Sequence, residues 1–244
     1  MMDSGPINRL KEIVGRSENI VAFTGAGISV PSGIPDFRSA GGLYSADYGE
    51  RSAEYMLSDE CLNYETEKFF KFYKEKMLYP DARPNEGHLW LADMESQGRL
   101  KAVITQNIDG LHTIAGSGNV IEFHGSVHRN YCVRCGRLYD ADFIANSKGI
   151  PVCESCGGTV RPDVVLYGER IDEQVITDSV NAVRSADCMI VIGTSLVVYP
   201  AAGLIEYFRG QNLVLINKSP TGYDSRASLV INGDIREIAL LMMK

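Results

Sequence analysis

The chain has 244 residues, which is long enough for one full hydrophobic core carrying a small satellite domain. Its apolar fraction of 45% and charged fraction of 23% are typical of soluble globular proteins, and no run approaches the roughly 20 apolar residues that span a bilayer. Acidic residues outnumber basic ones 31 to 24, and this net charge of -7 argues against direct binding of nucleic acid. Residues 1–6 lack the basic start and apolar run of a secretory signal, so we expect a cytoplasmic protein without membrane contact.

Short apolar runs alternate with helical stretches along most of the chain. Apolar residues at helical spacing predict helices over residues 7–15, 86–97, 172–186 and 200–208. Continuous apolar runs predict buried strands over residues 19–24, 102–105, 120–123, 188–192 and 213–216. The alternation is typical of an α/β fold, with a Rossmann-like parallel sheet that has helices on both faces. Polar residues and glycines follow these strands, and ligands of such sheets bind at that edge.

Two regions fall outside the alternation and are predicted to be insertions. Residues 41–80 hold a loop rich in Gly, Ser and Tyr and then a helical stretch over residues 65–77. Residues 129–160 lack long apolar runs and carry paired cysteines. We expect the two insertions to form one small domain together. The larger, Rossmann-like nucleotide-binding domain is then predicted to comprise residues 1–40, 81–128 and 161–244.

The paired cysteines have the spacing of a zinc site. The pairs are Cys132 with Cys135 and Cys153 with Cys156, each followed by glycine, with seventeen residues between the pairs. Two such C-x2-C turns can present four thiolates tetrahedrally to one Zn²⁺. A fourth cysteine ligand leaves no open position for water or substrate, so the metal is expected to be structural. A disulfide or a redox dithiol is the alternative.

A glycine-rich turn follows the first predicted strand. Gly25, Ala26 and Gly27 match the start of a phosphate-binding loop, but Val30 stands where G-x-G-x-x-G has its third glycine. Taken alone, the motif fits a nucleotide loop or a tight structural turn equally well, and it gives poor support to a hydride-transferring dehydrogenase. Further residues that could contact a nucleotide are Asp36, Phe37, Arg38, Gly193, Thr194, Ser195, Asn217 and Asp234. For Asn217, an ordinary turn residue is the simpler interpretation.

The ordered set of motifs resembles the sirtuin family. It comprises residues 25–29, 33–38, 105–109, His124 with Gly125, the two cysteine pairs and residues 193–196, spread over nearly the whole chain. The resemblance implies that NAD is consumed as a co-substrate: its nicotinamide is released, and the acyl group of an acyl-lysine in a protein or peptide passes to ADP-ribose. It also implies one structural Zn²⁺ per chain.

The resemblance also assigns roles to individual residues. His124 is the expected general base, because an imidazole with a pKa near 6.5 can accept a proton at neutral pH. Asn107, the other expected catalytic residue, is expected to hold the nicotinamide carboxamide with Asp109, beside Ile108. A helix cap is the alternative for Asp109. The full set expected to bind NAD is Gly25, Ala26, Gly27, Asp36, Phe37, Arg38, Gln106, Asn107, Ile108, Asp109, His124, Gly193, Thr194, Ser195, Asn217, Lys218, Asp234 and Ile235.

The acyl-lysine peptide is expected to pair with an extended segment of the chain. The residues assigned to this contact are Val164, Val165, Tyr167, Gly168 and Glu169. Sirtuins that prefer acidic acyl groups carry a tyrosine and, three residues later, an arginine, where this chain has Phe70 and Tyr73. Without a guanidinium there, a succinyl carboxylate loses its charge-assisted partner, so neutral acyl groups are expected to be preferred.

Three rival functions remain open at this point. Mono-ADP-ribosyl transfer to protein would use the same NAD site. A zinc-ribbon module without catalytic activity is a second possibility, although the acidic charge and the large α/β remainder argue against it. A nucleotide-binding domain of a flavin or thiamine enzyme would share the sheet, but it has no need of the four cysteines or of His124.

Overall fold

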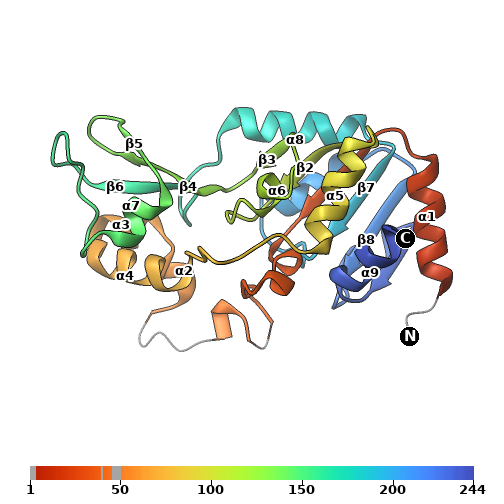
Figure 1. Ribbon diagram of the computed structural model, residues 1–244, viewed down its shortest axis with the longest axis horizontal. Coiled ribbons are helices and arrows are strands. Elements are labelled where there is room, and N and C mark those ends of the chain that lie inside the picture. The colour runs from red at the N-terminus through yellow and green to blue at the C-terminus, as the bar shows by residue number, and fades with distance from the viewer. Residues whose placement is uncertain (1–3, 40, 46–50) are drawn as a thin grey trace.

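The structure is a computed structural model that describes residues 4–39, 41–45 and 51–244. Its described residues contain a six-stranded parallel sheet with the strand order β3-β2-β1-β7-β8-β9 (Figure 1). The strands are β1 (Ile20–Thr24), β2 (Leu100–Thr105), β3 (Val120–Glu122), β7 (Cys188–Ile192), β8 (Asn212–Asn217) and β9 (Leu229–Asn232). The predicted parallel α/β sheet is confirmed, and the four-residue β9 is added to it.

The strand order reverses direction at β1. The next strand of the sheet in sequence, β2, lies on one side of β1, and β7 lies on the other. In sheets of this kind a crevice opens at the reversal point, beyond the carboxyl ends of the strands. The loops that follow β1 and β7 are therefore adjacent, although Thr24 and Ile192 are 168 positions apart in the sequence.

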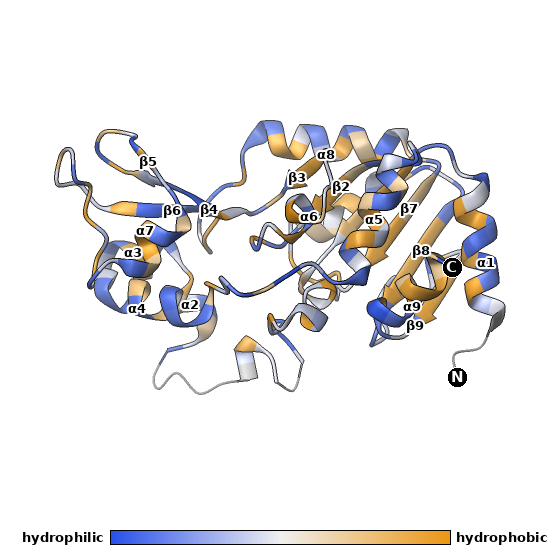
Figure 2. Ribbon diagram, viewed as in Figure 1, coloured by the Kyte–Doolittle hydropathy of each residue, from blue (hydrophilic) through white to orange (hydrophobic). Residues whose placement is uncertain are grey.

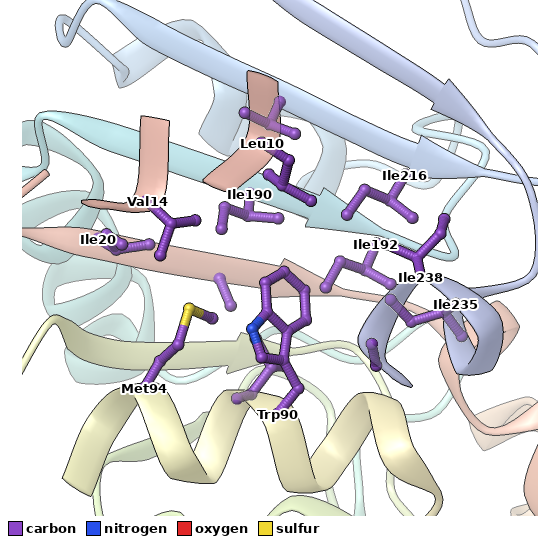
Figure 3. Packing of buried hydrophobic residues seen from close by; sticks show 14 of the residues in the cluster. Leu10, Val14, Ile20, Trp90, Met94, Ile190, Ile192, Ile216, Ile235 and Ile238 are labelled. Carbon is purple, nitrogen blue, oxygen red and sulfur yellow. The ribbon is translucent and has the colours of Figure 1, made fainter. Parts of the chain in front are cut away.

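Helices cover both faces of the large sheet. One face packs against α1 (Ser4–Arg16), α5 (Glu86–Ser96) and α9 (Ile235–Met242). Figure 3 shows Trp90 of α5 beside Ile192 of β7, and Met94 of the same helix pointing toward the sheet. The other face packs against α8 (Glu173–Ser185) and the helix Ala201–Tyr207.

The alternating direction of side chains along each strand explains why both faces of the large sheet are covered. In β1, Ile20 and Ala22 belong to the first core, whereas Val21 and Phe23 belong to the second. Successive side chains of a strand point to opposite faces, so a strand buried on both sides must be apolar throughout. Figure 2 shows this as apolar strands between helices of mixed hydropathy.

One predicted helix has a different geometry. The segment predicted as a helix over residues 200–208 is a 3₁₀ helix, Ala201–Tyr207. The amide of Gly203 donates to the carbonyl of Pro200 at 3.0 Å, which is the i to i+3 bond of that tighter helix.

A second group of elements lies beside the large sheet (Figure 1). It consists of α2 (Ala53–Met56), α3 (Asp59–Tyr64), α4 (Thr66–Lys76), α7 (Ala141–Asn146) and an antiparallel sheet in the order β5-β4-β6. The strands of this sheet are β4 (Gly125–Cys132), β5 (Leu138–Tyr139) and β6 (Val160–Val164). The short helix α6 (Leu111–Ile114) belongs to the larger part.

Both predicted insertions contribute to one apolar core. Phe69 and Tyr73 of α4 belong to the same buried cluster as Val127, Ile144 and Val160. This cluster contains side chains from the helical segment and from the cysteine-bearing segment, and none of its members belongs to the two cores that flank the large sheet. Of the predicted domain ranges, residues 1–3, 40 and 46–50 lie outside the described residues.

The polar residues before several helices act as caps. Ser52, Ser58, Asp140 and Asp172 each accept a backbone N–H bond at the start of α2, α3, α7 and α8. Asp234 does the same for α9 by accepting from the amide of Arg236 at 2.9 Å. Within the described residues, none of the helices combines the length and apolar character needed to cross a bilayer.

Candidate active site

A cavity of about 1140 Å³ lies beyond the carboxyl ends of the large sheet's strands and extends to the smaller group of elements. Typical small-molecule sites are roughly 300–1,000 Å³, so this one has room for a dinucleotide and part of a second substrate. Every residue that the sequence assigned to NAD or to the peptide lines this cavity, except Asp234. Among these described residues, Asp234 stands apart because its carboxylate caps α9 and pairs with Lys218 at 2.8 Å.

The glycine-rich turn packs directly against the loop that follows β7. The amide of Gly27 donates to the carbonyl of Gly193 at 2.8 Å, and a Cβ on Gly27 would lie 2.6 Å from the Cα of Gly193. No larger residue fits that contact, which explains the second glycine of the motif. The amides of Ala26 and Ser195 have no hydrogen-bond partner among the described residues, and both residues line the cavity. These two N–H groups fit a ligand with phosphate oxygens.

Asn107, Asp109 and Ser29 form one hydrogen-bond network. The Ser29 hydroxyl donates to Asp109 Oδ2 at 2.6 Å and accepts from Asn107 Nδ2 at 3.0 Å. Asp109 Oδ1 also accepts from the amide of Leu111, the first residue of α6, at 2.9 Å, and Asp109 lines the cavity. Burial raises the pKa of Asp109, although the bonds from Ser29 and Leu111 act in the opposite direction.

Ser29 was not among the residues assigned from the sequence. It is buried, and it lines the cavity between the glycine-rich turn and residues 106–109. The sequence feature that could have identified Ser29 was its position as the last residue of the motif Gly25–Ser29. A hydroxyl that follows a glycine-rich turn so closely must lie near whatever the turn holds.

His124 lies where the chain passes from the large sheet to the small one. Its Nδ1 donates to the carbonyl of Gln106 at 3.0 Å, because a carbonyl can only accept. The neutral ring therefore carries its proton on Nδ1, and Nε2 is an acceptor with no partner among the described residues. Burial lowers the pKa of His124, while the bond to Gln106 opposes this shift. The ring is thus held as a neutral base.

Gly125 makes this position of His124 possible. Its φ of +79° lies in the left-handed region, and a Cβ there would be 2.0 Å from the carbonyl oxygen of Asp163. The amide of Val165 donates to the carbonyl of His124 at 3.0 Å. The histidine is consequently fixed between the two sheets by its own main chain.

Asn217 is more than a turn residue. Its Oδ1 accepts from the amide of Thr194 at 2.9 Å, which joins the loops after β7 and β8. Its Nδ2 is buried without a hydrogen-bond partner in a residue that lines the cavity. An unsatisfied buried donor is costly, so this atom fits a ligand that offers an acceptor.

The loop that carries Phe37 is held by its own residues. Asp36 Oδ1 accepts from the amides of Arg38 and Ser39 at 3.1 and 2.8 Å. The Phe37 ring lies against Tyr44, with 5.5 Å between ring centroids. The carboxylate of Asp36 thus shapes the loop, and Phe37 contributes an apolar surface to the cavity wall.

The segment after β6 lines the cavity and ends in a turn, in which the amide of Glu169 donates to the carbonyl of Leu166 at 3.0 Å and Gly168 has a φ of +95°. The amide of Tyr167 donates to the carbonyl of Leu57 at 3.0 Å, and its carbonyl accepts from the amide of Asp59 at 3.0 Å. The carbonyl of Val165 and the amide of Gly168 have no partner among the described residues, so main-chain groups remain for a peptide. The carboxylate of Glu169 is used within the chain instead, by Arg161 and by the amide of Leu166.

The four cysteines come together away from this cavity. Their Sγ atoms lie within 4.8 Å of one another, with 3.4 Å between Cys132 and Cys156 and 3.7 Å between Cys135 and Cys153. Tetrahedral zinc with Zn–S bonds of about 2.3 Å requires sulfur atoms about 3.8 Å apart, whereas a disulfide requires about 2.05 Å. All four are free thiols, so the residues fit Zn²⁺, and the disulfide alternative is wrong for this structure.

The fold and the site together define an α/β protein with a four-cysteine group that fits zinc and a large cavity at the reversal point of its sheet. A sequence model described as the Sir2 family matches residues 25–200. The chain belongs to the Sir2 family, the family of the sirtuins.

Relatives at high identity support this assignment. An NAD-dependent protein deacetylase of Clostridium perfringens is 56% identical over 234 residues, which are 95% of this chain and 96% of the relative. Another, of Clostridium acetobutylicum, is 55% identical over the same number of residues, with the same coverage. A solved structure titled as Sir2 with p53 peptide and NAD+ has a TM-score of 0.86 and 39% identity, and covers 97% of each chain.

Proposed function

We propose that this chain is an NAD-dependent protein-lysine deacetylase. It transfers the acyl group of an acyl-lysine to ADP-ribose and releases nicotinamide. Supporting this, relatives more than half identical over nearly all of the chain are named NAD-dependent protein deacetylases. Related structures are titled with acetylated or propionylated peptides. The observation that carries the proposal is a neutral imidazole in the same cavity as the Ser29, Asn107 and Asp109 network.

We assign the cavity wall as follows. NAD provides an electrophilic ribose carbon once its nicotinamide leaves. Asn107 and Asp109 hold the carboxamide of the nicotinamide. Asn107 retains a free acceptor, since its Nδ2 already donates to Ser29 and to the carbonyl of Gly25. The phosphates bind the amides of Ala26 and Ser195, and Asn217 Nδ2 donates to the adenosine portion. Asp234 acts indirectly by holding Lys218.

His124 is the general base in this proposal. Its Nε2 takes a proton from a ribose hydroxyl, and the bond from Nδ1 to Gln106 keeps the ring in the required tautomer. Phe37 covers the ribose and excludes water from it. The acyl-peptide lies along residues 164–169 and uses the free main-chain groups there.

The zinc site and the domains belong to the same proposal. We assign the described residues within 1–40, 81–128 and 161–244 to the NAD-binding domain and those within 41–80 and 129–160 to the small domain. The small core also contains Val127, Val164 and Leu166, which lie just outside the latter ranges. Zn²⁺ held by the four cysteines joins the turns of the second segment without taking part in the reaction. The partners are acyl-lysine proteins of the cytoplasm, and the acidic charge disfavours nucleic acid.

Incubation with an acetyl-lysine peptide, with and without NAD, tests the proposal. We expect nicotinamide release that requires both substrates, and mass spectrometry should detect acetylated ADP-ribose. ADP-ribosylated protein without acetylated ADP-ribose would instead establish mono-ADP-ribosyl transfer. Absence of binding to both NAD and the peptide in a calorimeter would leave only a binding module.

The acyl preference can be tested on one peptide. Tyr73 lines the cavity and is buried, whereas Phe70 packs in the small core, so neither supplies a cation for an acidic acyl group. We expect kcat/KM for acetyl-lysine to exceed that for succinyl-lysine by at least about tenfold, since a charge-assisted bond contributes about 1.5–3 kcal/mol. Lys76 is a cation that also lines the cavity, so Lys76→Met tests whether its ammonium group binds an acidic acyl group; we expect the ratio to stay unchanged. A higher value for succinyl-lysine would refute the preference.

A further inference from the structure

Two tyrosines from distant segments of the chain meet through their hydroxyl groups. Tyr44 and Tyr167 are hydrogen-bonded although 123 positions separate them in the sequence. Both line the cavity. Tyr44 belongs to the loop that carries Phe37, and Tyr167 belongs to the segment after β6. The bond therefore joins the nucleotide side of the cavity to the side proposed for the acyl-peptide.

On the nucleotide side, Tyr44 is attached to Phe37 in two ways. The amide of Tyr44 donates to the carbonyl of Phe37 at 2.8 Å, and the two rings are in contact at 5.5 Å between centroids. The neighbouring amide, that of Leu43, donates to the carbonyl of Asp36 at 2.8 Å. The guanidinium of Arg38 lies over the Tyr44 ring, 5.2 Å from its centroid. A displacement of Tyr44 must therefore displace the residues that we assign to NAD.

On the peptide side, Tyr167 has a fixed main chain. Its amide and its carbonyl are both bonded to the Leu57–Asp59 stretch, at 3.0 Å each. Its side chain, in contrast, is about 40% exposed, so it can respond to a peptide laid along the segment. Burial and the bond to Tyr167 raise the pKa of Tyr44, so this hydroxyl keeps its proton across the working pH range.

We propose that the hydroxyl bond between Tyr44 and Tyr167 couples the two substrate sites, with Tyr167 acting as a positioning residue for the Phe37 loop. The inference rests on the proposed function. A peptide along residues 164–168 holds Tyr167, Tyr167 holds Tyr44, and the loop then stays against the bound nucleotide. Each ligand consequently tightens the binding of the other by the same factor. One neutral hydrogen bond accounts for a factor of roughly 2 to 10.

Calorimetry with ADP-ribose and an acetyl-lysine peptide measures this factor directly. ADP-ribose has no nicotinamide to lose, so the two ligands do not react during the titration. The dissociation constant of ADP-ribose is measured alone and at a saturating peptide concentration. The wild type is compared with Tyr44→Phe, Tyr167→Phe and the double variant. Tyr64→Phe is the matched control, because it removes the same atom from a tyrosine that is 83% exposed.

We expect the peptide to tighten ADP-ribose binding roughly 2- to 10-fold in the wild type and in Tyr64→Phe. The factor should fall to about one in either single variant. The double variant should match the singles, since one bond is lost in all three. A merely structural role would lower thermal stability without changing this factor.

Three outcomes would overturn the proposal. They are a wild type without coupling, a factor that survives either substitution, or a Tyr167→Phe variant that loses only peptide affinity. If the wild type deacetylates the peptide while one of these outcomes holds, the coupling fails and the proposed function stands. If the wild type binds neither ligand, the proposed function fails as well.

Discussion

Replacing His124 with alanine should lower kcat for deacetylation by about 10²- to 10⁴-fold, the usual contribution of a positioned general base. The ring is held by the bond from Nδ1 to Gln106. Among the described side chains that line the cavity, no other imidazole is both buried beside residues 106–109 and free at Nε2. ADP-ribose should still bind with nearly wild-type affinity, because the phosphate donors are unaffected. Steady-state kinetics and calorimetry on the same sample separate the two effects.

A matched control lies two residues away. Glu122 is partly buried, pairs with the exposed Arg129 and does not line the cavity, so Glu122→Gln should keep kcat within about twofold. A His124→Ala variant as active as Glu122→Gln would show that another group takes the proton. Loss of ADP-ribose binding together with activity would instead indicate a misfolded variant, which circular dichroism would reveal.

The pH dependence follows from the same imidazole. The base must be neutral, and burial places the pKa of His124 below its ordinary value of 6.5. As the pH falls, activity should therefore persist through 6.5 and decline only at lower values. A profile of kcat/KM against pH measures this inflection. An inflection above 6.5 in the wild type would contradict the assignment of His124.

Removing the zinc ligands should have the second large effect. Cys135→Ser or Cys153→Ser is expected to abolish zinc binding and to unfold the small domain. Structural zinc contributes about 10–16 kcal/mol in zinc-finger peptides, which is comparable to the whole stability of a domain. Cys132 and Cys153 are buried in the same core as α4 and β6, and the peptide segment continues directly from β6. Activity should therefore disappear with the metal.

Metal analysis and thermal unfolding check this expectation. The wild type should contain one zinc per chain, and a chelator should lower its melting temperature and its activity together. Cys61→Ala is the matched control, because Cys61 lies in the same core but outside the group of four. It should keep one zinc and most of the activity. Full activity in a zinc-free Cys135→Ser protein would exclude a structural role for the metal.

The sequence was most informative where a structure depends on neighbours along the chain. The C-x2-C pairs, the apolar runs of β1 and β7 and the glycine-rich turn each form within a few residues, so local pattern predicts them. The parallel sheet followed from the alternation of such runs. The short β9 was missed because four residues give too little periodicity, and the 3₁₀ geometry of Ala201–Tyr207 was missed because seven residues do not distinguish a period of 3.0 from one of 3.6.

Contacts between distant segments depended on the tertiary structure. Ser29 meets Asp109 across 80 positions, and Asp234 pairs with Lys218 instead of lining the cavity. Tyr44 and Tyr167 carry no motif that would join them. By itself, the sequence determined the sheet, the zinc ligands and the residues gathered at one edge. Only the tertiary structure decided which atoms of those residues are already bonded to one another and which remain for a ligand. The physical reason is that periodicity determines which face a side chain occupies, whereas its partner depends on how separate elements pack.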